Sequence, residues 1–417
     1  MQLRQRAAPH QGAAQRAAAA SSRRPVVVRR ASVGVQDAAV RSPLEADLQH
    51  LNPMWATVDS QAKFFGILDK LVEAGKCPPQ LVDGFKDFYL NYRGAVVGSG
   101  APGADEAFAT RVQATIADVV FAQFVAPYTF PSFHKRILEP YDYYTFGQRY
   151  VGSLIDFSAS VLGHAERAAE IDARLAAGHN VVLLANHQTE ADPGVFAHML
   201  QAYPRLAQEV IYVAGDRVVT DALCKPFSMG RNLFCVHSKK HMDDVPELKA
   251  AKQDTNRKTL VAMGRALGEG GKLIWIAPSG GRDRPRADGT WAPDTFDPSA
   301  VELMRNLLSR SKQPGHIYPM AMWSWKLMPP PPSVDKKLGE RRLTNYTGVG
   351  ISFAGELDVD AITAPAGGDK EAAQRLLAEA AHAAVTAEYA ALDRAITDPD
   401  WRAGQPAFSQ PWSSKHA

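Results

Sequence analysis

The sequence predicts an α/β protein in which a layered α/β domain follows a small helical domain. Three observations lead to this prediction. Beyond about residue 130, short apolar runs alternate with helical segments, which is the pattern of an α/β layer structure. Before that point, apolar residues recur at helical spacing. Hydrophobic residues make up 46% of the 417 residues, which is enough for a substantial core.

The segment 42–126 is predicted to be the helical domain, with helices near residues 54–75, 79–97 and 104–125. In the first helix, five apolar residues share one face: Trp55, Phe64, Phe65, Leu68 and Leu71. This face could form a docking groove, but packing against neighbouring helices is the interpretation that we favour.

Residues 130–412 are predicted to form the α/β domain. Six apolar runs are interpreted as strands: 179–185, 210–214, 233–236, 272–277, 316–320 and 348–353. Helices are expected at 193–203, 254–268, 298–310 and 370–397. We expect Asp254 to cap the second of these helices at its N-terminus.

The first 36 residues have the composition of an organelle transit peptide. They hold seven arginines and no lysine or acidic residue, and they are rich in alanine and serine. The apolar stretch of a secretory signal is missing from them. An uncleaved basic tail is the alternative. Without this segment, 40 basic residues face 44 acidic ones, a net charge of −4. This balance argues against general nucleic-acid binding, which usually needs a basic face.

The cysteines and the apolar runs exclude two further classes. Cys77, Cys224 and Cys235 include no CxxC pair, so we expect neither a disulfide scaffold nor a cysteine-based zinc site, and we expect a reducing compartment. The longest apolar runs, at 181–185 and 273–277, are about a quarter of the length that a membrane-spanning helix needs. We therefore expect no transmembrane segment.

Several standard enzyme motifs are absent from the sequence. We find no GxSxG elbow, no GxxxxGK[ST] phosphate loop and no HExxH helix. Polar residues instead follow directly after several predicted strands. Because ligands of open α/β sheets bind outside the carboxyl ends of strands, this placement indicates a site.

The first polar group, Asn-His-Gln-Thr-Glu-Ala-Asp-Pro at 186–193, contains a His-x₄-Asp pair. Asp192 and Pro193 have the pattern of a helix start, with Asp192 as N-cap. His187 would then lie in the preceding loop, from which its imidazole can fold back onto Asp192. Such a carboxylate fixes the imidazole tautomer and leaves the other ring nitrogen to accept a proton from a hydroxyl group. A capping aspartate beside an unrelated loop histidine is the alternative.

Two more groups carry positive charge. Lys240 and His241 come shortly after the strand at 233–236. Arg282 and Arg284 follow a tight glycine turn after the strand at 272–277. Glycines let backbone N–H groups approach an anion, and arginines bind phosphate bidentately. Each of the three polar groups alone could be solvated surface. All three at the ends of strands together predict a base and a phosphate clamp at one edge of the sheet.

These motifs resemble the plastid glycerol-3-phosphate acyltransferases, soluble stromal enzymes that acylate the sn-1 hydroxyl of glycerol 3-phosphate with acyl-acyl carrier protein. Besides 186–193, the resemblance covers Val-Ala-Gly-Asp-Arg-Val at 213–218, Cys-Lys-Pro-Phe-Ser at 224–228, Ser-Lys-Lys-His-Met at 238–242, Trp-Ile-Ala-Pro-Ser-Gly-Gly-Arg-Asp-Arg-Pro at 275–285 and Ser-Gln-Pro-Trp at 409–412. The segments 88–92 and 139–144 also match. Many members of the wider superfamily have Glu-Gly-Thr-Arg where this sequence has Ser-Gly-Gly-Arg at 279–282. The plastid branch shares this departure.

The resemblance implies a fold and a set of roles. The fold is a three-layer α/β/α domain with a mixed sheet, preceded by an N-terminal helical bundle. His187 would be the catalytic base and Asp192 its orienting carboxylate. Four residues would hold the substrate phosphate: Lys240, His241, Arg282 and Arg284. His237 stands where an aromatic residue is expected.

The resemblance also implies direct acyl transfer, with backbone donors near the motif stabilising the oxyanion. We expect no metal or organic cofactor, because a thioester is already an activated acyl group. Acyl-acyl carrier protein is the expected donor and partner, and the chloroplast stroma the expected location. Acyl-CoA as donor, lysophosphatidate as acceptor and a non-catalytic phosphoryl-ligand binding module are the alternatives. A basic surface should meet the carrier protein, with four candidates: Lys225, Arg231, Lys239 and Arg286.

Overall fold

The computed structural model describes residues 48–238, 242–243, 245–330 and 341–412. The described residues belong to one compact unit. The predicted transit segment, residues 1–36, lies outside them, as do Lys239, Lys240 and His241.

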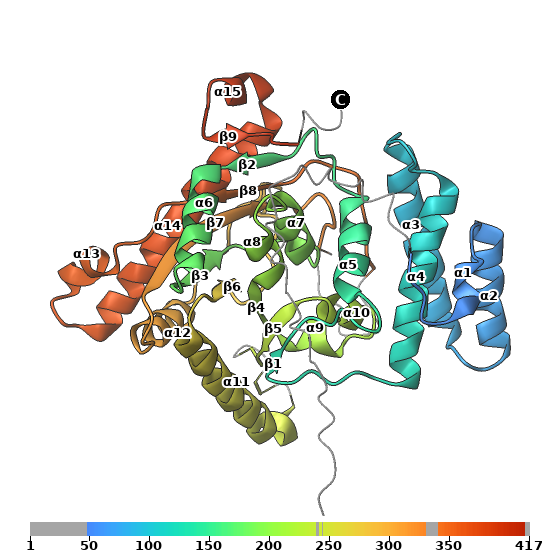
Figure 1. Cartoon of the computed structure of the whole chain (residues 1–417), viewed down its shortest axis with the longest axis horizontal. Helices are drawn as coiled ribbons and strands as arrows, with labels where there is room; N and C mark the ends of the chain where they lie inside the picture. The colour runs from blue at the N-terminus through green and yellow to red at the C-terminus, as the bar shows by residue number, and fades with distance from the viewer. Residues whose placement is uncertain (1–47, 239–241, 244, 331–340, 413–417) are drawn as a thin grey trace, which may run out of the picture. The chain divides into compact units, whose positions relative to one another are not determined.

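The first described segment is helical, as predicted (Figure 1). Its helices are α1 (Pro53–Ala56), α2 (Gln61–Glu73), α3 (Pro79–Gly98) and α4 (Glu106–Val125). The predicted helix at 54–75 is two helices, because the chain is extended at Ser60, the N-cap of α2. Trp55, Phe64 and Leu68 are buried, so the apolar face packs in the core and does not form a docking groove.

This helical segment shares a hydrophobic core with the rest of the chain. The Tyr92 hydroxyl lies 2.6 Å from Ser153 Oγ, and the Tyr92 and Tyr150 rings stack at 5.3 Å. Helix α4 contacts α5 (Tyr143–Gly152) and α10 (Lys225–Met229). The proposed division into domains at 42–126 and 130–412 stays a prediction.

One mixed sheet, nine-stranded within the described residues, forms the centre of the α/β region. Its strand order is β1-β5-β4-β6-β3-β7-β8-β2-β9. The bounds are β1 Phe133–His134, β2 Val161–Gly163, β3 Asn180–Ala185, β4 Ile211–Ala214, β5 Asn232–Cys235, β6 Leu273–Ile276, β7 Gly315–Trp323, β8 Gly350–Phe353 and β9 Phe408–Ser409.

The six predicted strands are all present, as β3 to β8. Strands β5, β4, β6, β3 and β7 are parallel neighbours in that order, and β8 runs antiparallel to β7. Strand β3 is buried along its whole length between β6 and β7. From Val181 to Ala185 its sequence is entirely apolar, as a strand covered on both faces requires.

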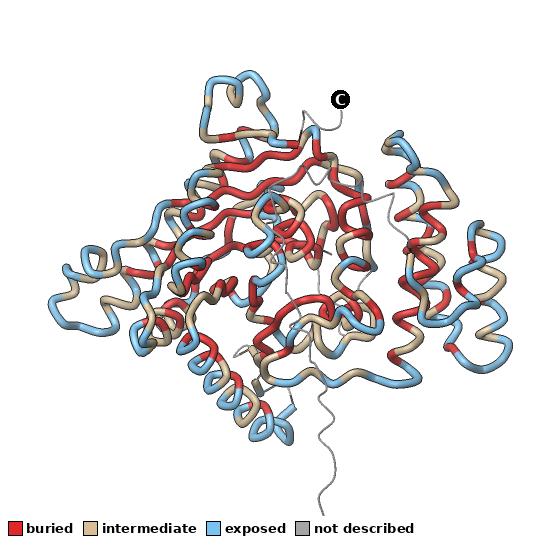
Figure 2. Tube along the Cα trace, viewed as in Figure 1, coloured by how far each residue is buried: buried red, intermediate tan, exposed pale blue. Residues whose placement is uncertain are grey.

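Helices cover both faces of the sheet, which gives the three layers (Figures 1 and 2). Alternate residues of β3 belong to two different hydrophobic clusters. Leu183 packs in the cluster with α5 and α7 (Asp192–Met199), and Leu184 in the cluster with α12 (Pro298–Ser309) and α14 (Lys370–Thr397). The remaining helices are α6 Ala165–Ala176, α7 Asp192–Met199, α8 Pro204–Glu209, α9 Asp216–Thr220, α11 Lys249–Glu269, α12 Pro298–Ser309, α13 Val359–Thr363, α14 Lys370–Thr397 and α15 Pro399–Ala403.

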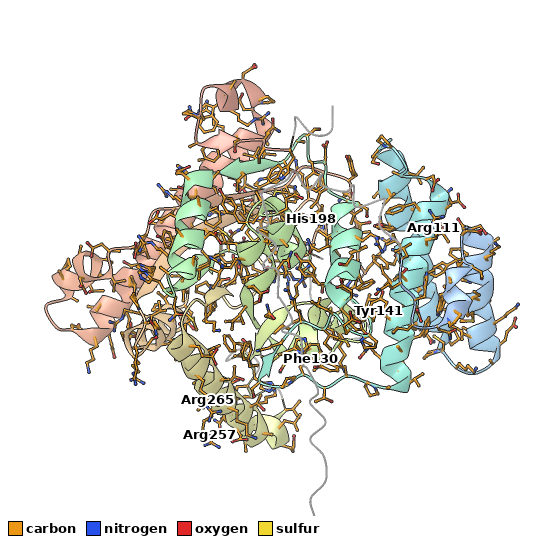
Figure 3. The ribbon with its side chains drawn as sticks, in the orientation of Figure 1. Arg111, Phe130, Tyr141, His198, Arg257 and Arg265 are labelled. Atoms are coloured by element: carbon orange, nitrogen blue, oxygen red, sulfur yellow. The ribbon has the colours of Figure 1, made fainter. Side chains whose placement is uncertain are left out.

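Helix α11 starts five residues earlier than predicted, so the N-cap assigned to Asp254 is wrong. A 3-10 turn at Pro246–Leu248 runs directly into the helix, so its first turn needs no cap at 254. Asp254 instead pairs along the helix surface with Arg257 and Lys258. Figure 3 labels Arg257 on this helix.

The close approach at Gly230 predicts a stability effect. A Cβ atom there would lie 2.3 Å from the backbone oxygen of Tyr143. Gly230→Ala should therefore lower the free energy of unfolding by about 1–3 kcal/mol through overpacking. In α11 a Cβ at Gly264 meets nothing within 4 Å, so Gly264→Ala should be neutral or stabilising by about 0.5–1 kcal/mol. Urea unfolding of both variants checks this, and equal effects would contradict it.

Candidate active site

Strands β3, β6 and β7 bring the site residues to one edge of the sheet. Strand β3 ends at Ala185 and pairs in parallel with both neighbours, so the loop after it lies between the segments that leave β6 and β7. The Asp283 N–H, in the loop after β6, donates to His187 O at 2.6 Å. The first and third polar groups predicted from the sequence therefore lie together.

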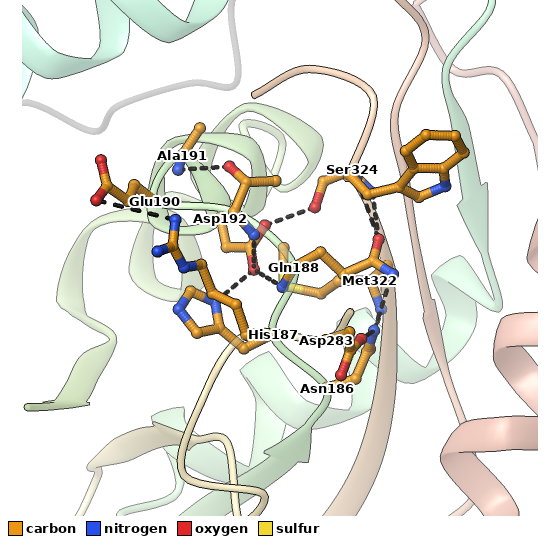
Figure 4. Close-up of polar contacts among 12 residues, drawn as sticks. Asn186, His187, Gln188, Glu190, Ala191, Asp192, Asp283, Met322 and Ser324 are labelled. Atoms are coloured by element: carbon orange, nitrogen blue, oxygen red, sulfur yellow. Dashed lines mark hydrogen bonds and ion pairs between the residues drawn. The ribbon is translucent and has the colours of Figure 1, made fainter. Parts of the chain in front are cut away.

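His187 and Asp192 form a hydrogen-bonded pair (Figure 4). His187 Nδ1 lies 2.7 Å from Asp192 Oδ2. The Asp192 side chain is 1% exposed and that of His187 is 26% exposed. No hydrogen bond to a described residue engages His187 Nε2. The arrangement leaves this nitrogen to exchange a proton with a ligand.

Asp192 is not the N-cap of α7, which corrects the sequence prediction. Ala191 occupies the cap position and Asp192 is the first residue of the helix. Its carboxylate points back to the preceding loop, where Oδ2 accepts from Gln188 N at 2.7 Å and Thr189 N at 3.3 Å. Asp192 turns toward the loop and does not cap the helix because its carboxylate is buried. A buried carboxylate needs several donors, and the loop provides them.

The backbone N–H groups of this loop are largely committed. Besides the two that Asp192 accepts, Ala191 N donates to Thr189 Oγ1 at 2.7 Å and Asp192 N to Thr189 O at 3.1 Å. These donors cannot also stabilise an oxyanion in this arrangement. If backbone donors near the motif stabilise the oxyanion, they are N–H groups other than these four.

Further hydrogen bonds join the loop to Ser324, directly after β7, and to Tyr389 in α14. Ser324 Oγ donates to Asp192 Oδ1 at 2.5 Å. Gln188 Oε1 accepts from Ser324 N at 2.9 Å, and its Nε2 donates to Tyr389 OH at 3.1 Å. Ser324 and Tyr389 could not be identified from the sequence, since neither lies in a recognisable motif and both are far from His187 in the chain.

Asn186 and Asp283 form a second buried contact beneath His187 (Figure 4). Asn186 Nδ2 donates to Asp283 Oδ2 at 2.8 Å. Asp283 has no exposed surface, and burial raises the pKa of its carboxyl group to about 7. Asp283 is not among the residues predicted for the site, although it stands between the two arginines of the predicted clamp.

Glu190, in the His187 loop, is the centre of an ion-pair network. Arg342 Nε donates to Glu190 Oε2 at 2.7 Å, and Arg282 lies 3.9 Å from Glu190 Oε1. Burial alone would raise the pKa of Glu190, but the charges of Arg342, Arg282 and Arg217 hold it below its ordinary value. Arg282 is thus placed within ion-pair distance of the loop that carries His187.

The other predicted contacts have mixed outcomes. Arg284 Nη1 donates to the backbone oxygens of Arg282 and Asp283, so its side chain folds onto its own loop. Lys240 and His241 lie outside the described residues. His237 pairs with Asp216. We expected Arg231 to be part of a carrier-protein surface, and this prediction is wrong. Arg231 is buried and contacts Gln148 and the Tyr144 ring.

The turn before these arginines requires glycine. Gly280 has a positive φ of 71°, a conformation that L side chains rarely adopt. Its N–H donates to Ala277 O at 3.0 Å and closes the turn directly after β6. This geometry directs residues 281–284 toward the His187 loop.

Comparison with known proteins shows that two family models match parts of this chain. A family model described as "Glycerol-3-phosphate acyltransferase N-terminal" matches residues 54–128, which cover α2 to α4 and all of α1 except its first residue. A second model, "Acyltransferase", matches residues 167–323 and includes His187, Asp192 and both arginines. The two matches follow the change from helical to α/β structure along the chain.

Several curated chloroplastic glycerol-3-phosphate acyltransferases are similar over most of the chain. The protein from Arabidopsis thaliana is 42% identical over 388 residues, which cover 92% of this chain and 83% of the relative. That from Pisum sativum is 45% identical over 350 residues, 83% of this chain and 76% of the relative. That from Spinacia oleracea is 41% identical over 365 residues, 86% and 77%.

Asp283→Asn should change the pH dependence of stability. The pKa of Asp283 is about 7 in the folded protein and 3.8 without its surroundings. At a pH between these two pKa values, Asp283 keeps its proton in the folded state and has released it in the unfolded chain. The stability of the parent relative to the variant should therefore fall, by up to about 4 kcal/mol, as the pH rises from about 4 to about 7, and stay level above that. Urea-unfolding series at several pH values test this, and parallel curves would contradict it.

Proposed function

The chain belongs to the chloroplastic glycerol-3-phosphate acyltransferase family, and we propose that it transfers a fatty acyl group from a thioester to the sn-1 hydroxyl of glycerol 3-phosphate. The product is lysophosphatidate. The observation that carries this proposal is the His187–Asp192 pair, which lies next to a loop with two arginines. A base beside a cationic clamp suits an acceptor that has a hydroxyl at one end and a phosphate at the other.

In the proposed step, His187 is the general base. Asp192 binds Nδ1, so Nε2 takes the proton from the sn-1 hydroxyl as its oxygen attacks the thioester carbonyl. The new C–O bond replaces the C–S bond, and the departing thiolate recovers the proton from His187. Asp192 orients the imidazole and stabilises the imidazolium form, because its buried carboxylate carries the opposite charge.

The phosphate of the acceptor would bind Arg282 and Arg284, together with Lys240 and His241. Arg282 supports this role through its place 3.9 Å from Glu190 in the His187 loop. Guanidinium groups suit a phosphate because they offer paired donors in one plane. The clamp would hold one end of glycerol 3-phosphate while His187 acts at the other.

We propose acyl-acyl carrier protein as the donor and the chloroplast stroma as the location. The relatives are named chloroplastic, which supports the organelle. The resemblance of the site motifs to the stromal enzymes supports the carrier protein as donor. None of the described helices combines the length and apolar character that crossing a bilayer requires.

His187→Ala should lower kcat by at least about 10²–10⁴-fold, the usual contribution of a general base. The assay supplies glycerol 3-phosphate with either oleoyl-acyl carrier protein or oleoyl-CoA, and measures 1-acyl-glycerol 3-phosphate. His179→Ala is the matched control, because His179 precedes the opposite end of the same strand. The control should keep the parent rate within about twofold.

Full turnover by His187→Ala would refute its role as the base. Product from oleoyl-CoA alone would refute the carrier-protein donor. If the parent gives no product with either donor while glycerol 3-phosphate still binds, a phosphoryl-ligand binding module becomes the better interpretation.

Arg284→Ala should raise the KM for glycerol 3-phosphate and leave the KM for the acyl donor unchanged. Loss of one charge-assisted contact weakens binding by about 1.5–3 kcal/mol, or about 10–150-fold. Arg257→Ala is the control, because this arginine lies on the exposed surface of α11 and pairs with Asp254 there (Figure 3). Steady-state kinetics with each substrate varied measures both constants. An unaltered KM for glycerol 3-phosphate would remove Arg284 from the clamp.

A further inference from the structure

Asp283 links the loop that carries Arg282 and Arg284 to the His187 loop. It stands between Arg282 and Arg284, and its backbone N–H donates to His187 O at 2.6 Å. The residue that carries the proposed base is thus bonded directly to the residue between the two proposed phosphate ligands. A shift of either loop has to break or move this contact.

The Asp283 carboxylate extends the connection to two more segments. Oδ1 accepts from Asp294 N at 3.0 Å, in the segment that leads to α12. Oδ2 accepts from Asn186 Nδ2 at 2.8 Å, at the end of β3. The Asn186 amide is itself fixed on β7, since Met322 N donates to its Oδ1 at 2.7 Å and its Nδ2 also donates to Met322 O at 3.0 Å.

This arrangement requires a residue with two acceptor oxygens. An asparagine at 283 could accept from Asp294 N, but its amide N–H₂ would then face the N–H₂ of Asn186. Asn186 cannot turn its amide over without losing both bonds to Met322. A carboxyl group is therefore required in a fully buried position, although burial there opposes its ionisation.

We propose that Asp283 is a positioning residue that sets the distance between the phosphate clamp and His187. The inference rests on the proposed function. The acceptor has a three-carbon backbone, so its phosphate and its reacting hydroxyl keep a limited range of separations. The clamp and the base must match that range, and a misplacement of about 1 Å can lower the rate about 10²-fold.

The test is Asp283→Asn, a change that keeps the size of the side chain and removes one acceptor. We expect a folded protein in which kcat/KM for glycerol 3-phosphate falls about 10–100-fold, with KM raised and kcat lowered. The KM for the acyl donor should stay within about twofold. Asp294→Asn is the matched control, because it removes an exposed carboxylate from the neighbouring segment and keeps the backbone N–H that Asp283 accepts. The control should behave as the parent.

Unchanged kinetic constants per folded molecule, or equal losses for both substrates, would overturn the proposal. If Asp283→Asn does not fold, Asn186→Ala is measured by the same criteria, because it removes the partner amide and leaves the bond to Asp294. Failure of both variants to fold would assign Asp283 to folding alone and would also overturn it. A parent protein without acyl transfer would instead refute the proposed function, so the two failures are distinguishable.

Discussion

The buried carboxylate of Asp192 is the constraint on which the rest of the site depends. A carboxylate with almost no exposure is tolerated only where donors surround it. Gln188 N, Thr189 N and the Ser324 hydroxyl provide them, and His187 completes the set. These contacts hold the loop in a single conformation and fix the imidazole tautomer. The orientation of the proposed base therefore follows from the electrostatics of one side chain.

The order of the strands makes these contacts possible. Because β3 lies between β6 and β7, polar side chains that follow it reach residues from both neighbours. Asn186 meets Asp283 on one side and Met322 on the other, and Gln188 meets Ser324. Parallel pairing places all of these residues at the carboxyl edge. The site is thus built across three strands, and no single loop could hold it alone.

The core of the sheet could be predicted from the sequence, whereas its margins could not. Residues 181–185 of β3 are a continuous apolar run because both faces of the strand are covered, and that pattern is local. Strands β1, β2 and β9 have two or three residues, too few for any periodicity, and exist only because a neighbour pairs with them. The assignment of Asp254 as a cap failed for a related reason: side-chain chemistry allows capping, but the start of α11 is set by the turn before it.

The same distinction applies to the site. His187 and Asp192 are five residues apart, so loop geometry alone predicts that they can meet. Arg342 meets Glu190 across 152 residues, and no local pattern indicates that contact. The consequence is electrostatic, because the sequence shows the positive charges at 282 and 284 but not the carboxylate that faces them. Glu190 offsets part of this charge and, at 3.9 Å, draws Arg282 toward the His187 loop. A phosphate at the clamp would have to compete with Glu190 for Arg282, so the balance between these charges contributes to its affinity.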